Sequence, residues 1–185
     1  MLNRIFLTFI SLFIVLTSFY LGYNVIDKKE KMNENVQKIL AYYQEDNDSF
    51  TDEEKYIGIL EIPSINLKRG FYDKTSKLNV LNKNIYYLNE SISLENKNSM
   101  IILAAHRGNS SVSFFNDLDK LLIGNEIILN FKNKEYKYVF TNKYNELKDG
   151  RLNIYRDEEK DSLILITCNK RRSKYQTIYV SYRKE

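Results

Sequence analysis

Residues 163–170 read LILITCNK, and this stretch holds the only cysteine of the chain. Four apolar residues precede Thr167 and Cys168, a pattern typical of a buried strand that ends on a thiol. Free cysteine is among the most buried residue types and often packs as a small hydrophobe. Composition alone therefore favours a core role for Cys168, and a chemical role needs support from the surrounding sequence.

Short apolar runs bounded by turn signals recur on both sides of this stretch. Val, Ile, Tyr and Phe dominate these runs, as half-buried strands require. The runs are YIGILEI (56–62), MIILAAH (100–106), NEIILNF (125–131), EYKYVFT (135–141), SLILITC (162–168) and TIYVSY (177–182). Many short strands with few helices predict a mostly β fold that closes, or nearly closes, into a barrel.

One segment between these runs favours a helix instead. It reads SVSFFNDLDKLLIG and covers residues 111–124. Ser113 is a suitable N-cap, and Gly124 is placed to end the helix. The barrel is therefore expected to carry a few short helices.

Composition excludes several functional classes. The 185 residues carry a net charge of +4 that is mixed along the sequence, without the basic tracts of a nucleic-acid-binding protein. One cysteine excludes an intramolecular disulfide, and one cysteine with one histidine argues against a structural zinc site, which needs four ligands. No cluster of carboxylates suggests a calcium site. We therefore expect no metal, no cofactor and no nucleic-acid partner.

The N-terminal segment has the properties of a membrane anchor. Residues 5–26 contain no charged residue, are long enough to span a hydrocarbon core as a helix, and follow Arg4. A cleaved signal peptide is the alternative, but the segment is longer than a usual signal core and lacks a small-x-small cleavage site. We predict an uncleaved transmembrane anchor over residues 1–27.

The remaining chain divides into a spacer and a globular domain. Residues 28–54 are charged, with apolar side chains at helical spacing, and predict a stalk helix followed by a polar linker. Residues 55–185 carry the predicted strands. Lys28, Lys29 and Lys31 directly follow the anchor, so the positive-inside rule alone would place the globular domain on the cytoplasmic side.

Two predicted strands end on the only residues of their kind. MIILAAH ends on His106, and SLILITC ends on Cys168. A solitary cysteine with a histidine distant in sequence is the minimal pairing of a nucleophile with an acid–base partner. The alternative, a core cysteine and an unrelated histidine at a strand end, stays open on spacing alone.

Three segments together resemble the sortase family. LITC (165–168) resembles the Thr-Leu-x-Thr-Cys signature of sortases, and AAHRGNSSVSFFNDLDKLLIGNEIIL (104–129) resembles their histidine segment. IGILEIPSINLKRGFYD (57–73) is similar to their opening pair of strands. The resemblance covers about residues 56–182 in order, and its motifs are specific in combination.

This resemblance implies a closed sortase-type β-barrel of about eight strands and a cysteine transpeptidase activity. Such an enzyme cleaves a sorting signal of the Leu-Pro-x-Thr-Gly kind through a thioester and passes the acyl group to an amine of a cell-wall precursor or protein. Cys168 would be the nucleophile and His106 the acid–base partner. The implied partners are surface proteins bearing sorting signals. The implied location is the cell membrane, with a single-pass anchor and an extracellular domain, the opposite of the orientation that charge alone favours.

One position departs from the family pattern. Sortases carry an arginine at the start of the last strand, and the matching residue here is Gln176. A glutamine amide donates hydrogen bonds but brings no charge to a developing oxyanion. Arg171 and Arg172, in the preceding loop, are further candidates for this role, and the alternative is that both are ordinary exposed residues.

Class and reaction outcome leave alternatives open. The end of the chain at Glu185 and the lack of an Asp-Pro-aromatic lid segment favour a class D or class B sortase over the pilin-polymerising type. A thiol hydrolase on the same scaffold is one alternative to a transpeptidase. A catalytically weak surface binding module is another, and the Gln176 departure supports it.

Overall fold

The structure is a computed structural model that describes residues 2–43, 54–108 and 110–184. The chain forms two compact units, Met1–Gln37 and Lys38–Glu185, and each is described by itself. The predicted linker lies almost entirely within residues 44–53, outside the described residues.

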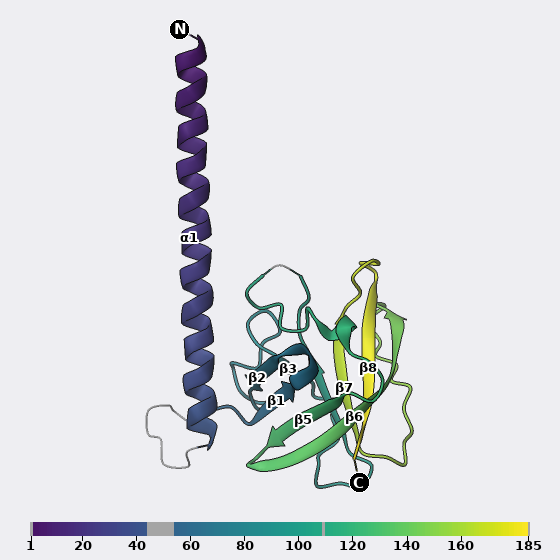
Figure 1. Ribbon diagram of the computed structural model, residues 1–185. Helices are drawn as coiled ribbons and strands as arrows, with labels where there is room; N and C mark the ends of the chain where they lie inside the picture. The colour runs from purple at the N-terminus through teal and green to yellow at the C-terminus, as the bar shows by residue number, and fades with distance from the viewer. Residues whose placement is uncertain (1, 44–53, 109, 185) are drawn as a thin grey trace. The chain divides into compact units, whose positions relative to one another are not determined.

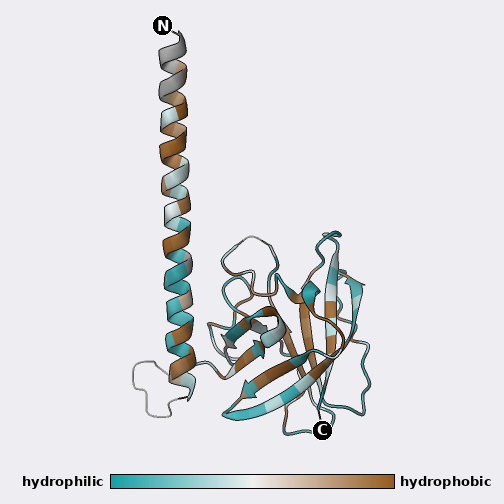
Figure 2. Ribbon diagram, viewed as in Figure 1, coloured by the Kyte–Doolittle hydropathy of each residue, from teal (hydrophilic) through white to brown (hydrophobic). Residues whose placement is uncertain are grey.

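A continuous helix, α1, runs from Leu2 to Tyr43 and covers both the predicted anchor and the predicted stalk helix. Figure 2 shows hydrophobic residues along its N-terminal part and hydrophilic ones toward its end. Within the described residues it is the one helix whose length and apolar composition suffice to cross a membrane. Its last turn belongs to the second unit, where Lys38 Nζ donates to the Tyr72 hydroxyl at 2.8 Å.

The second unit is an eight-stranded sheet in the order β2-β1-β5-β6-β8-β7-β4-β3 (Figure 1). The strands are β1 (Gly58–Ile62), β2 (Leu67–Phe71), β3 (Tyr86–Tyr87), β4 (Met100–Ala104), β5 (Glu126–Phe131), β6 (Lys134–Leu147), β7 (Ser162–Cys168) and β8 (Tyr175–Arg183). A bridge between Phe71 and Ile85 joins the two edges, so the sheet is a nearly closed barrel. The predicted eight-stranded barrel is confirmed.

One pair of neighbouring strands is parallel and the others are antiparallel. β4 runs parallel to β7, with Met100 opposite Ser162 and Ala104 opposite Ile166. β6 is twice as long as the hairpin pattern predicted, because it continues past a register shift between Phe140 and Asn142 to pair with the whole of β8. These two features bring the C-terminal ends of β4, β6 and β7 and the N-terminal end of β8 to one region.

The helix predicted over residues 111–124 is wrong. The segment forms successive tight turns and one short 3₁₀ helix, η2 (Leu118–Lys120). Its backbone bonds join residues three apart, as from Leu118 N to Phe115 O and from Leu121 N to Leu118 O. Three residues per turn place these three apolar side chains on one side, where all are buried in the barrel core. Gly124 does take a positive φ of 94°.

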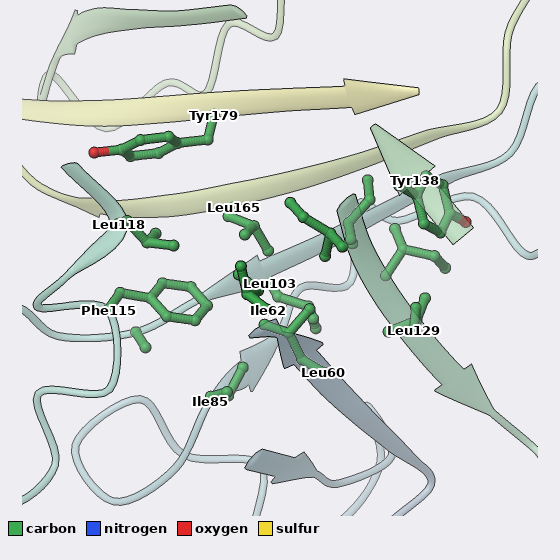
Figure 3. Close-up of a cluster of buried hydrophobic side chains, with 14 of the residues drawn as sticks. Leu60, Ile62, Ile85, Leu103, Phe115, Leu118, Leu129, Tyr138, Leu165 and Tyr179 are labelled. Carbon is green, nitrogen blue, oxygen red and sulfur yellow. The ribbon is translucent and has the colours of Figure 1, made fainter. Parts of the chain in front are cut away.

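The barrel interior is filled by alternate residues of the strands, as period-two side-chain geometry requires. Figure 3 shows Leu60 and Ile62 from β1 meeting Leu103 of β4, Leu129 of β5 and Leu165 of β7. All five are fully buried.

A second apolar cluster lies on the opposite face of β4, β7 and β8, and we call it the outer cluster. Leu152 and Ile154 from the β6–β7 connection pack against it. Its buried members are Ile102, Ile164, Ile166, Ile178 and Val180. Because both faces of β4 and β7 are apolar, these strands read as continuous hydrophobic runs.

Replacing Leu165 tests the interior core. Leu165→Ala removes a fully buried side chain from β7, so the free energy of unfolding should fall by about 2–5 kcal/mol. Urea unfolding of the full-length chain in detergent micelles, followed by tyrosine circular dichroism, measures the change. Leu122→Ala is the control because Leu122 is 70% exposed. Equal effects of the two substitutions would contradict this assignment of the core.

Asp161 ties three strands together where β7 begins. Its carboxylate accepts from Ser99 N at 2.7 Å and Ser99 Oγ at 2.9 Å, and pairs with Arg183 Nη1 at 3.1 Å. Partial burial opposes ionisation, but the hydrogen bonds from Ser99 and the Arg183 charge outweigh it and lower the pKa of Asp161. The ionised carboxylate therefore contributes stability above its unfolded pKa, and this is lost as pH falls through the folded pKa.

Asp161→Asn should therefore lower stability most near neutrality. We expect a loss of about 1–3 kcal/mol in the free energy of unfolding at pH 7, because charged hydrogen bonds are removed. The stability difference from the unmodified chain should narrow as pH falls below the ordinary aspartate pKa and through the lowered pKa of Asp161, where the native carboxylate becomes protonated. Urea unfolding across this range measures it, with Glu158→Gln as the control for losing one exposed carboxylate. A gap independent of pH would contradict the proposed role of Asp161.

Candidate active site

Cys168 is the last residue of β7 and is partly exposed. Leu163 and Leu165 point into the barrel, so the residues that alternate with them point outward. Cys168 follows Ile164 and Ile166 on this outward face, at the end of the outer cluster. It belongs to neither buried cluster, so the core role that composition favoured does not hold.

His106 lies two residues beyond the end of β4. The parallel ladder pairs Ala104 with Ile166, and it continues through a bond from Ala105 N to Ile166 O at 3.2 Å. The buried hydroxyl of Thr167 donates to Ala105 O at 2.9 Å and fixes the same register. Continued for one further step along both chains, this register would put His106 opposite Cys168, and neighbouring strands lie about 4.8 Å apart. A continued ladder would therefore bring the two unique residues to one end of one face.

The His106 ring is partly exposed and has a polar partner. Nε2 lies 2.9 Å from Asn82 Oδ1, on the segment between β2 and β3. With the amide in this orientation, Asn82 accepts and Nε2 donates, which leaves Nδ1 of a neutral ring free to accept a proton. Such a contact fixes ring orientation and tautomer together.

Gln176 is the register partner of Cys168 on β8. On the far side of β8, Gln176 pairs with Glu146 of β6. The three side chains therefore form a row across three strands on one face. No guanidinium occupies this row.

Arg171 and Arg172 lie in the β7–β8 turn and are exposed. Both backbone N–H groups donate to Asn169 Oδ1 at 3.0 Å, which shapes the turn. The Arg172 guanidinium lies 5.6 Å from the centre of the Tyr175 ring. Neither arginine has a hydrogen bond to Cys168 or Gln176 among the bonds of the described residues.

Arg171 lines a pocket of about 630 Å³ together with Thr177 and Tyr179, which alternate with Gln176 along β8. This pocket holds an ion pair in which Arg107 Nη2 lies 2.7 Å from Asp119 Oδ2, with the Arg107 side chain largely buried and the Asp119 side chain exposed. Burial opposes ionisation, but the Arg107 hydrogen bond and charge lower the pKa of Asp119. Within the described part of the chain, no group of three or more His, Cys, Asp or Glu side chains is placed to hold a metal.

Lys148 is a site residue that the sequence did not indicate. Its Nζ lies 3.2 Å from Cys168 Sγ and 3.1 Å from Ser173 O. The hairpin pattern predicted β6 only as far as residue 141, and the sequence around Lys148 reads NELKDG, which carries no motif. The contact depends on the long β6, whose register with β8 no local pattern reveals. Asn82 was missed as well, because its contact with His106 joins residues 24 apart in the sequence.

The Sortase domain model matches residues 60–184, so the chain belongs to the sortase family. This match covers more than half of the chain and confirms the family that the three sequence segments predicted. A sortase-type transpeptidase is the class of enzyme that this family and fold support. No curated protein matches the chain.

Solved sortase structures share the fold. Sortase A from Corynebacterium diphtheriae, a lid mutant, matches with a TM-score of 0.61 and 20% identity over 70% of each chain. Sortase C1 from Streptococcus agalactiae matches with a TM-score of 0.59 and 29% identity over 70% of this chain and 68% of that one. Sortase C from Streptococcus pneumoniae matches with a TM-score of 0.61 and 22% identity, over 70% and 67%. The expected class D or class B character stays a prediction.

Proposed function

We propose that the protein is a membrane-anchored cysteine transpeptidase that cleaves an LPxTG-like sorting signal. The observation that carries the proposal is the parallel ladder of β4 and β7, whose last pair, Ala104 and Ile166, lies two residues before His106 and Cys168. Both residues are partly exposed and follow the strands that carry the outer cluster. Membership of the sortase family supports the same reaction class.

The proposed reaction has two halves joined by a thioester. The Cys168 thiolate attacks the carbonyl carbon of the scissile peptide bond, so that a carbon–sulfur bond forms as the carbon–nitrogen bond breaks. His106 gives its proton to the leaving amine. An acceptor amine then attacks the thioester carbon, loses a proton to His106 and releases the thiolate. The catalyst returns to its starting protonation state without a cofactor.

The acceptor decides the outcome of the second half. An amine of a cell-wall precursor or of another protein gives transpeptidation, and water gives hydrolysis on the same acyl-enzyme. A surface binding module with weak catalysis is the remaining alternative, supported by Gln176 in place of the usual arginine. The partners we propose are surface proteins that bear sorting signals.

We further propose that residues 1–27 anchor the protein in the cell membrane as a single span, with the catalytic domain outside the cell. The apolar part of α1 supports this location by its length and composition. Residues 28–54 would form the stalk and linker, and residues 55–185 the catalytic barrel. A cysteine without a second cysteine cannot be lost to an intramolecular disulfide in an oxidising exterior.

Mass spectrometry on the full-length chain in detergent micelles tests this function. The protein is incubated with a library of sorting-signal peptides, with and without amine acceptors. We expect an acyl adduct on Cys168 that is resolved onto the amine, no adduct with Cys168→Ala, and turnover reduced about 10²–10⁴-fold with His106→Ala because proton transfer is lost. Folded protein that gives no adduct with any peptide would contradict the proposal and favour the binding module.

A further inference from the structure

Gln176 leaves the proposed active site without the guanidinium that sortases place there, yet the ammonium of Lys148, the residue directly after β6, contacts the sulfur. We propose that Lys148 is a catalytic residue whose ammonium stabilises the Cys168 thiolate and the oxyanion formed during acyl transfer. The inference rests on the proposed transpeptidase function. It assigns the missing charge to β6 rather than to β8 or to the β7–β8 turn.

Lys148 is held in place by backbone contacts at both ends. Its N–H donates to Lys174 O at 2.9 Å, which extends the β6–β8 ladder one step past Leu147. Its ammonium donates to Ser173 O at 3.1 Å and to Cys168 Sγ at 3.2 Å. An ammonium has three donors, so one remains for a substrate oxygen bound beside the sulfur.

The Glu146 side chain, on the same face as Lys148, has a hydrogen-bond partner of its own. Alternation along β6 puts Lys148 on the same face as Glu146, the β8-paired neighbour of Gln176. The Glu146 carboxylate accepts from Asn153 Nδ2 at 2.7 Å. In the part of the chain that the structure describes, Lys148 has no ion pair with a carboxylate, and its ammonium donates to one carbonyl and to the thiol.

The other nearby cations have different partners. Lys170 Nζ lies 3.8 Å from Asp119, and the Arg172 guanidinium lies on the Tyr175 ring. Arg171 lines the pocket on the other face of β8. Of the described lysines and arginines, Lys148 is therefore the one with a hydrogen bond to Cys168 Sγ.

A hydrogen bond from a cation to a sulfur anion is stronger than one to a neutral thiol, so the contact favours the reactive form. The same ammonium favours the tetrahedral intermediate, in which the carbonyl oxygen carries negative charge. Removing one oxyanion donor from a buried site costs about 10²–10³ in kcat. Lys148 is exposed, so we expect a smaller loss, about 10–100-fold, because water screens its charge.

Three variants of the full-length chain in detergent micelles test the proposal: Lys148→Met, Lys148→Arg and the double variant Lys148→Met with Gln176→Arg. One readout is the rate of Cys168 alkylation by iodoacetamide, a neutral reagent, and the other is kcat and KM for peptide cleavage. We expect Lys148→Met to slow both alkylation and kcat with little change in KM. Lys148→Arg should retain most of both rates because it keeps the charge.

The double variant is the sharpest arm, since an arginine at the position opposite Cys168 should recover part of the lost kcat. Lys97→Met, which removes one exposed ammonium between β3 and β4, controls for net charge and should match the unmodified chain. Near-UV circular dichroism verifies that each variant is folded. Alkylation and kcat unchanged by Lys148→Met, or reduced equally by Lys148→Arg, would overturn the proposal.

Failure of the proposed function gives a different result. If the unmodified chain cleaves no peptide, the transpeptidase proposal fails. The alkylation rates alone then test whether the Lys148 ammonium acts on the Cys168 sulfur. Slower alkylation in Lys148→Met than in Lys97→Met would then still support the action of the ammonium on the sulfur. Equal rates would overturn it.

Discussion

The parallel pairing of β4 with β7 is the interaction on which the candidate site depends. It lies between two apolar layers, with Leu103 and Leu165 packed inside the barrel and Ile102 and Ile164 in the outer cluster. A register slip of one residue would turn the interior side chains outward and the outer-cluster side chains inward. The register is therefore strongly specified. Just past the last paired residues, the Thr167 hydroxyl donates to Ala105 O, one residue before His106, and so fixes the same register there.

The polar and reactive side chains lie at the strand ends, where the two apolar layers stop. The interior and the outer cluster need apolar residues along the whole of β4 and β7, but the strand ends reach solvent, where His106 and Cys168 are both partly exposed. A rigid ladder sets their backbone spacing, and Asn82 orients the ring. β6 continues past its register shift, so that Lys148, the residue directly after it, reaches the Cys168 sulfur. Two strand pairings are thus involved: β4 with β7 leads to His106 and Cys168, and β6 with β8 leads to Lys148.

The sequence predicts the parts of this arrangement that depend on local pattern. β7 begins and ends where SLILITC does, because a buried strand shows as a continuous apolar run. The residues 111–124 mislead, because apolar spacing of three fits a run of tight turns as well as a helix. Lys148 is invisible to such reasoning, since its role follows from a long-range register. The resemblance to sortases assigned roles to Cys168 and His106 and identified Gln176 as the departure from the usual arginine. It did not indicate Lys148, the residue that we propose supplies the missing charge.

Engineered disulfide formation tests most directly the claim that the ladder sets residues 106 and 168 side by side. Neighbouring strands lie about 4.8 Å apart, within the Cα separation that a disulfide spans. His106→Cys in the full-length chain should form an intramolecular disulfide with Cys168 under mild oxidation, seen by mass and by protection from alkylation. Ser110→Cys, on an exposed loop, should leave both thiols free. Two free thiols in the folded His106→Cys protein would contradict the account.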